Sequence, residues 1–232
     1  MSLALHGATL RAKEDVGGGL VRLTLEPSFA IRDSYVRPGQ YVVVRAEGKD
    51  AYFVLAGDVG QPTWELVLRP SGDAAMAALA TSPGGSVSVS EARGDGFPME
   101  QAKRRPLLVA VTGSGIAAAR PVVRARLRGG EGRETELFLG VRRLSDVPME
   151  DELRDWSRAG VGVTVCLSRE AVPQGRDGLA SGYVQDVARA HAKVGALAPK
   201  MIFAAGVKEM IDAVRVLAAE LGIEESDFRT NY

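Results

Sequence analysis

The 232-residue chain is poor in the side chains that most often bind metals. It holds one cysteine, Cys166, and two histidines, His6 and His191, which lie far apart in the sequence. A single cysteine excludes a disulfide framework, a cysteine-ligated iron–sulfur cluster and a structural zinc site built from this chain alone. Two isolated histidines argue against histidine-rich metal chemistry. We therefore expect no metal site.

The chain also lacks an excess of charge of either sign and any long apolar run. Its 29 basic residues balance 29 acidic ones, which excludes a nucleic-acid-binding protein that works by bulk electrostatics. No stretch approaches the roughly 20 apolar residues that cross a bilayer, and residues 1–6 lack the pattern of a signal peptide. We expect a cytoplasmic globular protein that neither spans a membrane nor binds nucleic acid.

The first hundred residues show the period-two hydrophobicity of half-buried strands. Val21, Leu23 and Leu25 alternate with polar neighbours, for example. Alternation predicts strands at residues 21–26 and 64–69, and shorter apolar segments predict further strands at 41–44, 52–55 and 87–89. Short strands separated by Gly and Pro favour a small antiparallel β-barrel. The alanine-rich residues 74–80 predict one short helix across an opening of that barrel.

The pattern changes after the polar residues 99–105, which we interpret as a linker. Residues 107–111 form a continuous apolar run, as in a parallel strand buried on both faces. Further strands are predicted at 136–141, 161–167 and 201–205, and a helix over 208–221 that ends at Gly222. Alternation of strands and helices indicates a doubly wound parallel sheet. We therefore expect two domains, a β-barrel over 1–104 and an α/β domain over 105–232.

A glycine turn follows the first strand of the second half. Gly113-Ser114-Gly115 lies between the buried strand and an alanine-rich segment that begins at Ile116. Glycines let the backbone approach a phosphate closely, and the first N–H groups of a helix attract that anion. The third glycine of the standard dinucleotide fingerprint is absent, so a purely structural turn remains an alternative.

Further segments, in collinear order, resemble the ferredoxin–NADP reductase superfamily. These are Arg37-Pro38-Gly39-Gln40-Tyr41, Gly94-Asp95-Gly96-Phe97, Arg105-Pro106 before the buried strand, the turn Gly113-Ser114-Gly115-Ile116-Ala117, Gly140-Val141-Arg142, Ser168-Arg169, Gly182-Tyr183-Val184-Gln185, Gly206 with Met210, and the terminal Tyr232. The similarity runs from roughly residue 10 to the C-terminus. It implies a flavin-dependent oxidoreductase in which NAD(P)H passes a hydride to FAD and electrons continue to an acceptor, either a protein or a small molecule.

The resemblance also implies roles for individual residues. Tyr232 would lie against the flavin as the catalytic aromatic residue. The flavin would be held by Tyr52, Phe53 and Val54. The nicotinamide nucleotide would be bound by the following residues: Gly113, Ser114, Gly115, Ile116, Arg142, Ser168, Arg169, Tyr183, Gln185, Gly206 and Met210. Ser168-Arg169 would suit a 2′-phosphate because an arginine offers a bidentate fork to phosphate oxygens.

The flavin motif of the family, Arg-x-Tyr-Ser, is altered here. Asp50-Ala51-Tyr52-Phe53 occupies its place, and Asp73 stands where a serine or threonine opens a short helix. An aspartate cannot replace an arginine beside a diphosphate, since two anions repel. The alternative hypothesis is therefore a non-catalytic binding or regulatory module that keeps the fold without firm FAD binding.

Several residues also have a simpler interpretation. Tyr52 could be an aromatic of the barrel core, and Tyr183 a surface cap on a helix. Cys166 lies in an apolar strand and is interpreted as a buried small hydrophobe. Arg120, Arg124 and Arg128 recur every four residues, which predicts a solvated helix face. We also expect that Gly115→Val would obstruct nucleotide docking and leave the fold intact.

Overall fold

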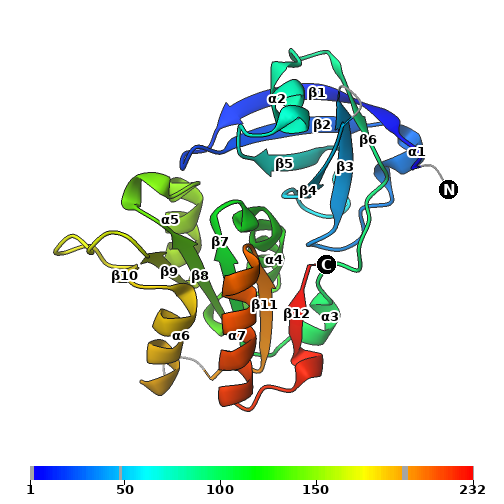
Figure 1. The fold of residues 1–232 in the computed structure, drawn as a ribbon. Coiled ribbons are helices and arrows are strands. Elements are labelled where there is room, and N and C mark those ends of the chain that lie inside the picture. The colour runs from blue at the N-terminus through cyan, green and yellow to red at the C-terminus, as the bar shows by residue number, and fades with distance from the viewer. Residues whose placement is uncertain (1–2, 47–48, 195–197, 232) are drawn as a thin grey trace.

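The computed structural model describes residues 3–46, 49–194 and 198–231. It has two halves, each built around one six-stranded sheet (Figure 1). The chain leaves the first sheet before α3 (Met99–Ala102), a short helix within the predicted linker, and then enters the second sheet. This is the two-domain architecture predicted from the sequence, although the boundary between residues 104 and 105 stays a prediction.

The first half is an antiparallel sheet with the strand order β4-β3-β6-β1-β2-β5. Its strands and helices are β1 (His6–Asp15), β2 (Val21–Pro27), α1 (Phe29–Arg32), β3 (Tyr41–Ala46), β4 (Lys49–Val54), β5 (Trp64–Leu68), α2 (Asp73–Ala80) and β6 (Ser86–Val89). A bridge between Leu55 and Leu66 joins the chain after β4 to β5, which closes the sheet on itself. The inner positions Leu23, Leu25 and Leu66 are completely buried, as their alternation with polar residues requires.

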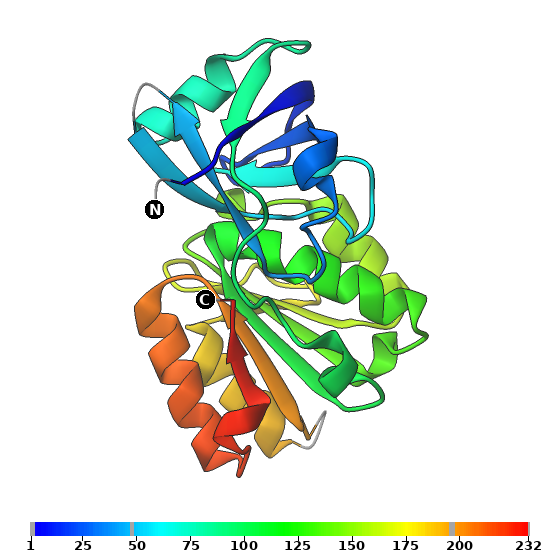
Figure 2. The ribbon, with the colours of Figure 1, turned by 90° about the vertical axis from the view of Figure 1, so that its right-hand side faces the viewer.

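The second half is a parallel sheet with the order β10-β9-β8-β7-β11-β12. Its elements are β7 (Leu107–Thr112), the 3₁₀ turn η1 (Gly113–Gly115), α4 (Ile116–Arg128), η2 (Gly132–Glu134), β8 (Thr135–Val141), η3 (Leu144–Asp146), α5 (Glu150–Arg158), β9 (Gly162–Leu167), β10 (Leu179–Ser181), α6 (Val184–Lys193), β11 (Met201–Ala205), α7 (Lys208–Glu220), η4 (Glu225–Asp227) and β12 (Phe228–Thr230). Helices cover both faces of this sheet (Figure 2). From β7 in the middle, β8, β9 and β10 follow in order on one side, and β11 and β12 follow on the other side. The order therefore reverses between β7 and β11, where ligands bind in open α/β sheets.

One hydrophobic cluster spans the two halves, beside a separate core in each half. Leu20, Ala56 and Val67 of the first half belong to the same buried cluster as the apolar side chains of β7, β8 and α4. Phe97, just before α3, stacks on Phe203 of β11 with ring centroids 4.6 Å apart and planes 7° from parallel. Continuous apolar packing of this kind fixes how the halves sit against each other.

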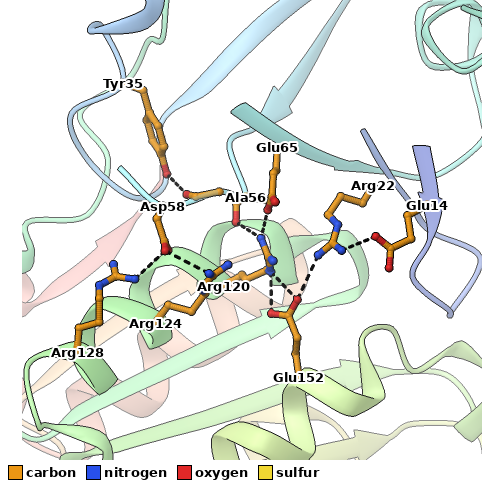
Figure 3. Close-up of polar contacts among 11 residues, drawn as sticks. Glu14, Arg22, Tyr35, Ala56, Asp58, Glu65, Arg120, Arg124, Arg128 and Glu152 are labelled. Atoms are coloured by element: carbon orange, nitrogen blue, oxygen red, sulfur yellow. Dashed lines mark hydrogen bonds and ion pairs between the residues drawn. The ribbon is translucent and has the colours of Figure 1, made fainter. Parts of the chain in front are cut away.

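An ion-pair network crosses the same junction (Figure 3). Arg120 on α4 pairs with Glu65 of β5 and, at 2.7 Å, with Glu152 of α5, and it donates to the carbonyl of Ala56 at 2.9 Å. Its side chain is 4% exposed. The prediction that this helix face is solvated is therefore wrong at Arg120, which the antiparallel half covers, whereas the side chains of Arg124 and Arg128 are 36% and 56% exposed.

The neighbouring arginines complete the network from the same helix. Arg124 and Arg128 both pair with Asp58, at 3.3 and 2.7 Å. Arg22 of β2 reaches Glu152 at 3.2 Å. The four-residue spacing of the arginines did indicate one helix face, and this face carries the electrostatic contact between the halves.

None of the helices in the described part of the chain combines the length and the apolar character that a bilayer crossing requires. Within the same residues, no three His, Cys, Asp or Glu side chains gather in a way that could hold a metal ion.

Candidate functional site

A cavity of about 800 Å³ lies at the carboxyl ends of β7, β8 and β9. The strand ends contribute Thr112, Gly140 and Val141, and Cys166 lies at its floor. The N-terminal ends of α6 and α7 border it with Tyr183 and Val207, the two residues that precede these helices. Cavities of this size are typical of small-molecule and cofactor sites. Helix N-termini around it favour a ligand that carries negative charge.

The glycine turn forms one wall of the cavity. Gly113 has φ +52°, in the left-handed region that glycine adopts at little cost, and a Cβ there would meet open space. Ser114 is exposed, and both residues line the cavity. The turn therefore leaves room at the point where α4 begins.

Gly115 has a different role from the one we expected. A Cβ on this residue would lie 2.5 Å from the carbonyl oxygen of Ala205, which is backbone and cannot move aside. Gly115 lets α4 start directly against the end of β11, and it does not line the cavity. The expectation that Gly115→Val leaves the fold intact is wrong for this reason.

Two further residues of the predicted set support the turn from behind. Ile116 is completely buried in the core shared by the two halves. Gly206 has φ +144°, and a Cβ there would approach the Oγ1 of Thr112 to 2.1 Å. That same oxygen accepts a hydrogen bond from the N–H of Val207 at 3.0 Å. The side chain of Ile116 and the backbone of Gly206 thus shape the turn from outside the cavity.

The remaining residues predicted for the nucleotide meet at the cavity. Besides Gly113 and Ser114, its lining contains Arg142, Ser168, Arg169, Tyr183, Gln185 and Met210. They come from the glycine turn, the loops that follow β8 and β9, the start of α6, and α7, and they lie between residues 113 and 210. The hydroxyl of Ser168 donates to the carbonyl of Val141 at 3.2 Å, which ties the loop after β9 to the end of β8.

Tyr183 lies both at the start of α6 and at the cavity, and its contact with a nucleotide stays a prediction. It is the N-cap residue of α6, although its side chain makes no capping hydrogen bond. The side chain is 60% exposed beside the cavity, so one face of the ring is available for stacking.

Sequence reasoning missed several charged residues of this cavity. Arg69 reaches it from the end of β5 in the antiparallel half, and its Nη1 lies 3.4 Å from the carbonyl oxygen of Gly18. Asp146 and Glu209 bring negative charge to the lining. The carboxylate of Asp146 accepts a hydrogen bond from the N–H of Arg143 at 3.1 Å, which holds the loop after β8. No motif in the sequence marks Arg69, since its proximity comes from the packing of the two halves.

Cys166 is buried, as expected from its apolar strand. Burial raises the pKa of its thiol to about 12. The thiol therefore stays protonated at neutral pH, whereas the reactive form of a cysteine is the deprotonated thiolate. We assign it no chemical role.

The residues predicted to hold a flavin lie on β4. The Tyr52 side chain is 69% exposed, so the interpretation of Tyr52 as a barrel-core aromatic is wrong. Its ring lies 5.6 Å from that of Tyr41 on β3, tilted by 60°. Phe53 and Val54 are partly buried and pack against the cores of the antiparallel half and of the junction, respectively. Tyr52 is thus the member of this set that offers an open aromatic face.

Both acidic replacements in the flavin motif are paired with cations. Asp50 accepts two hydrogen bonds from Arg45 on β3, and Asp73 pairs with Lys49. Asp73 does not cap α2, since the N-cap residue is Gly72 and no side chain bonds to the first turn. Each carboxylate therefore stands beside a positive charge that the motif alone did not reveal.

Tyr232 lies outside the described residues. The preceding residue, Asn231, is buried, and its Cβ approaches Gly39, just before β3. The chain after β12 therefore reaches the antiparallel half beside Tyr41.

Comparisons with known proteins agree with this architecture. Residues 108–216 match the model of the oxidoreductase NAD-binding domain family. The fruit protein pKIWI502 of Actinidia deliciosa is 28% identical over 192 residues, which cover 76% of this chain and 59% of that protein. Ferredoxin–NADP reductase B of Sorangium cellulosum (strain So ce56) is 29% identical over 183 residues, which cover 76% of this chain and 75% of the relative.

A solved structure shows the same fold over both whole chains. A ferredoxin–NADP⁺ reductase from Neisseria gonorrhoeae with bound FAD and NADP superposes with a TM-score of 0.76 at 16% identity, covering 100% of each chain. The barrel, the parallel sheet and the cavity at its switch point define a two-domain reductase architecture. The family match thus covers the parallel-sheet half of the chain, and the structural likeness shows a ferredoxin reductase-like fold over both halves.

Proposed function

We propose that this chain is an NAD(P)H-dependent flavin oxidoreductase that takes a hydride from NAD(P)H, passes it to FAD and delivers electrons to an acceptor. One observation carries the proposal: the cavity at the switch point of the parallel sheet collects eight of the residues predicted to bind a nicotinamide nucleotide. The names of the relatives support it, since one is a ferredoxin–NADP reductase and one contains FAD and NADP.

The residues around the cavity suit a dinucleotide. The open turn at Gly113 and Ser114 and the N-terminus of α4 would receive its diphosphate. The exposed ring of Tyr183 would stack on an adenine, and Arg142 and Arg169 would bind phosphate oxygens. The protein would thus contact the nucleotide along the whole length of the nucleotide, and these contacts would fix the position of the nicotinamide ring.

The outer face of β4 would receive the flavin ring. Tyr52 presents an exposed aromatic face, and the partly buried Phe53 and Val54 hold its strand against the two cores. FAD, when bound there, supplies the ring that accepts the hydride. Hydride transfer depends chiefly on positioning two rings and needs little acid–base help from the protein. The absence of a catalytic dyad among the predicted residues is therefore no obstacle.

A second candidate is the non-catalytic module. Asp50 and Asp73 favour it, because each places a carboxylate where a phosphate of FAD would otherwise be attracted. The two candidates make opposite predictions for the purified full chain. The enzyme is yellow, or becomes so on titration with FAD, and then oxidises NADH or NADPH. A colourless protein that rejects added FAD and oxidises neither coenzyme would contradict the enzyme and support the module.

A further inference from the structure

The outer face of β3 and β4 carries an aromatic residue and a charged pair side by side. Neighbouring strands pair Arg45 with Asp50, and paired residues point to the same side of a sheet. Tyr52 lies two residues beyond Asp50 on β4 and therefore shares that side. Val42 and Val44 of β3 point to the opposite side of the sheet from Arg45, and both are completely buried. Arg45, Asp50 and Tyr52 therefore stand together on the face turned away from the barrel core.

The Arg45–Asp50 pair leaves part of the guanidinium free. Nε of Arg45 donates to Oδ1 of Asp50 at 2.5 Å and Nη2 donates to Oδ2 at 2.7 Å. A guanidinium has five N–H donors, so this fork uses two of them. Within the described residues, Nη1 has no hydrogen-bond partner, and the Arg45 side chain is 41% exposed. The hydrogen bond from Arg45 lowers the pKa of the Asp50 carboxyl, so the pair stays ionised at neutral pH. Asp50 thus orients a cation that keeps donors for a second anion.

Lys49, the other cation near this hairpin, does not meet these conditions. Its ammonium pairs with Asp73 on α2. As the immediate neighbour of Asp50 in the strand, Lys49 also points to the opposite side from Asp50 and Tyr52. Arg45 is the better placed of the two for a ligand that lies on Tyr52.

We infer that Arg45 binds the diphosphate of an FAD whose isoalloxazine ring lies against Tyr52. Positions two apart on a strand are separated by about 7 Å, a distance that the ribityl chain between the flavin ring and its first phosphate can span. Arg45 would supply from β3 the positive charge that the sequence of β4 lacks, and Asp50 would orient it rather than face the phosphates alone. This inference rests on the proposed function, since it identifies a residue that holds the proposed cofactor.

Equilibrium binding of FAD and of riboflavin to the purified, flavin-free full chain tests the inference. Riboflavin has the same ring and no phosphate, so the comparison isolates the diphosphate contact. Arg45→Ala should weaken FAD binding by about tenfold or more, because hydrogen bonds to charged groups are lost, and leave riboflavin binding unchanged. Tyr52→Ala should weaken both ligands alike. Arg11→Ala is the matched control: Arg11 is an exposed arginine paired with Glu26 in the same sheet, and its loss should change neither affinity.

The possible outcomes separate this inference from the proposed function. Equal losses of FAD and riboflavin in Arg45→Ala, or no loss of either, would overturn the role of Arg45. A wild-type protein that binds riboflavin as tightly as FAD would also overturn the role of Arg45. The proposed hydride transfer to a flavin would not be affected by that result. If neither flavin binds to the folded wild-type chain, the inference and the proposed function both fall. Circular dichroism of each variant confirms that the fold is kept.

Discussion

Arg120 and Glu65 form a salt bridge between the two halves of the molecule, and the arginine is almost entirely buried. Burial lowers the pKa of Arg120, but its bonds to Glu152 and Glu65 outweigh that effect, so the guanidinium stays charged. The contact places the first turns of α4 beside β5. Since α4 begins at the cavity, the same salt bridge positions the glycine turn relative to the antiparallel half.

Arg120→Ala should destabilise the protein by about 3 kcal/mol. Removing one partner of a buried ion pair leaves uncompensated charge, here the carboxylate of Glu65, whereas Glu152 keeps its pair with Arg22. Urea unfolding followed by circular dichroism measures the loss. Arg124→Ala is the matched control on the same helix, since the side chain of Arg124 is 36% exposed and surface pairs contribute about 1 kcal/mol or less. Equal losses in the two variants would show that the burial of Arg120 has no energetic consequence.

This network marks the limit of what the sequence could predict. The four-residue spacing of the arginines correctly placed them on one helix face, because that spacing is local geometry. Glu65 lies 55 residues before Arg120, and nothing in the spacing tells which surface covers the face. Arg69 was missed for the same reason. Most strands and the glycine turn were predicted, because buried runs and turn residues are encoded locally. The ten-residue β1 was missed, because only Ala8 and Leu10 of its residues are buried, and so was the three-residue β10.

Gly115 and Gly113 should respond very differently to substitution, although both belong to the same turn. Gly115→Val should cost about 3 kcal/mol or more, because the new side chain meets the backbone carbonyl of Ala205. Gly113→Ala should cost about 1 kcal/mol, the strain of a left-handed backbone, since a Cβ there meets nothing. Thermal unfolding of both variants measures the difference. A Gly115→Val protein as stable as the wild type would contradict the close approach of α4 and β11.

Glu136 on β8 predicts a pH dependence of stability. Burial raises the pKa of its carboxyl, so the folded state binds this proton more tightly than the unfolded state. The contribution of Glu136 to stability is therefore most favourable below its unfolded pKa and is lost as the pH rises through its folded pKa. Glutamine at this position cannot ionise, so Glu136→Gln avoids the loss of stability that ionisation of Glu136 causes. The melting temperature of the variant should therefore exceed that of the wild type at neutral pH.

The difference should vanish when the pH falls below the ordinary range of a glutamate. Thermal melts of the two proteins across this range provide the test. A constant gap between wild type and Glu136→Gln at every pH would point to packing instead of ionisation.

Arg69 and Arg169 line the same cavity from different halves of the molecule, and we expect them to bind different parts of the nucleotide. Arg169 follows Ser168 in the loop after β9, where a 2′-phosphate would be received. Arg169→Ala should therefore weaken NADP⁺ by about tenfold and leave NAD⁺ unchanged, because a charged hydrogen bond is lost only with the phosphorylated coenzyme.

Arg69 extends from the end of β5, on the side of the cavity formed by the antiparallel half. A nucleotide whose nicotinamide reaches toward that half would bring its diphosphate, which NAD⁺ and NADP⁺ share, within range of this guanidinium. Arg69→Ala should therefore weaken both coenzymes, by a similar factor of about ten. Within the described part of the chain, the only hydrogen bond of the Arg69 side chain is the long contact to Gly18, so the variant should keep the wild-type melting temperature. Isothermal titration of each variant with both coenzymes distinguishes the two roles. Loss of NADP⁺ alone in Arg69→Ala would instead assign the 2′-phosphate to the antiparallel half and reverse the orientation of the nucleotide in the cavity.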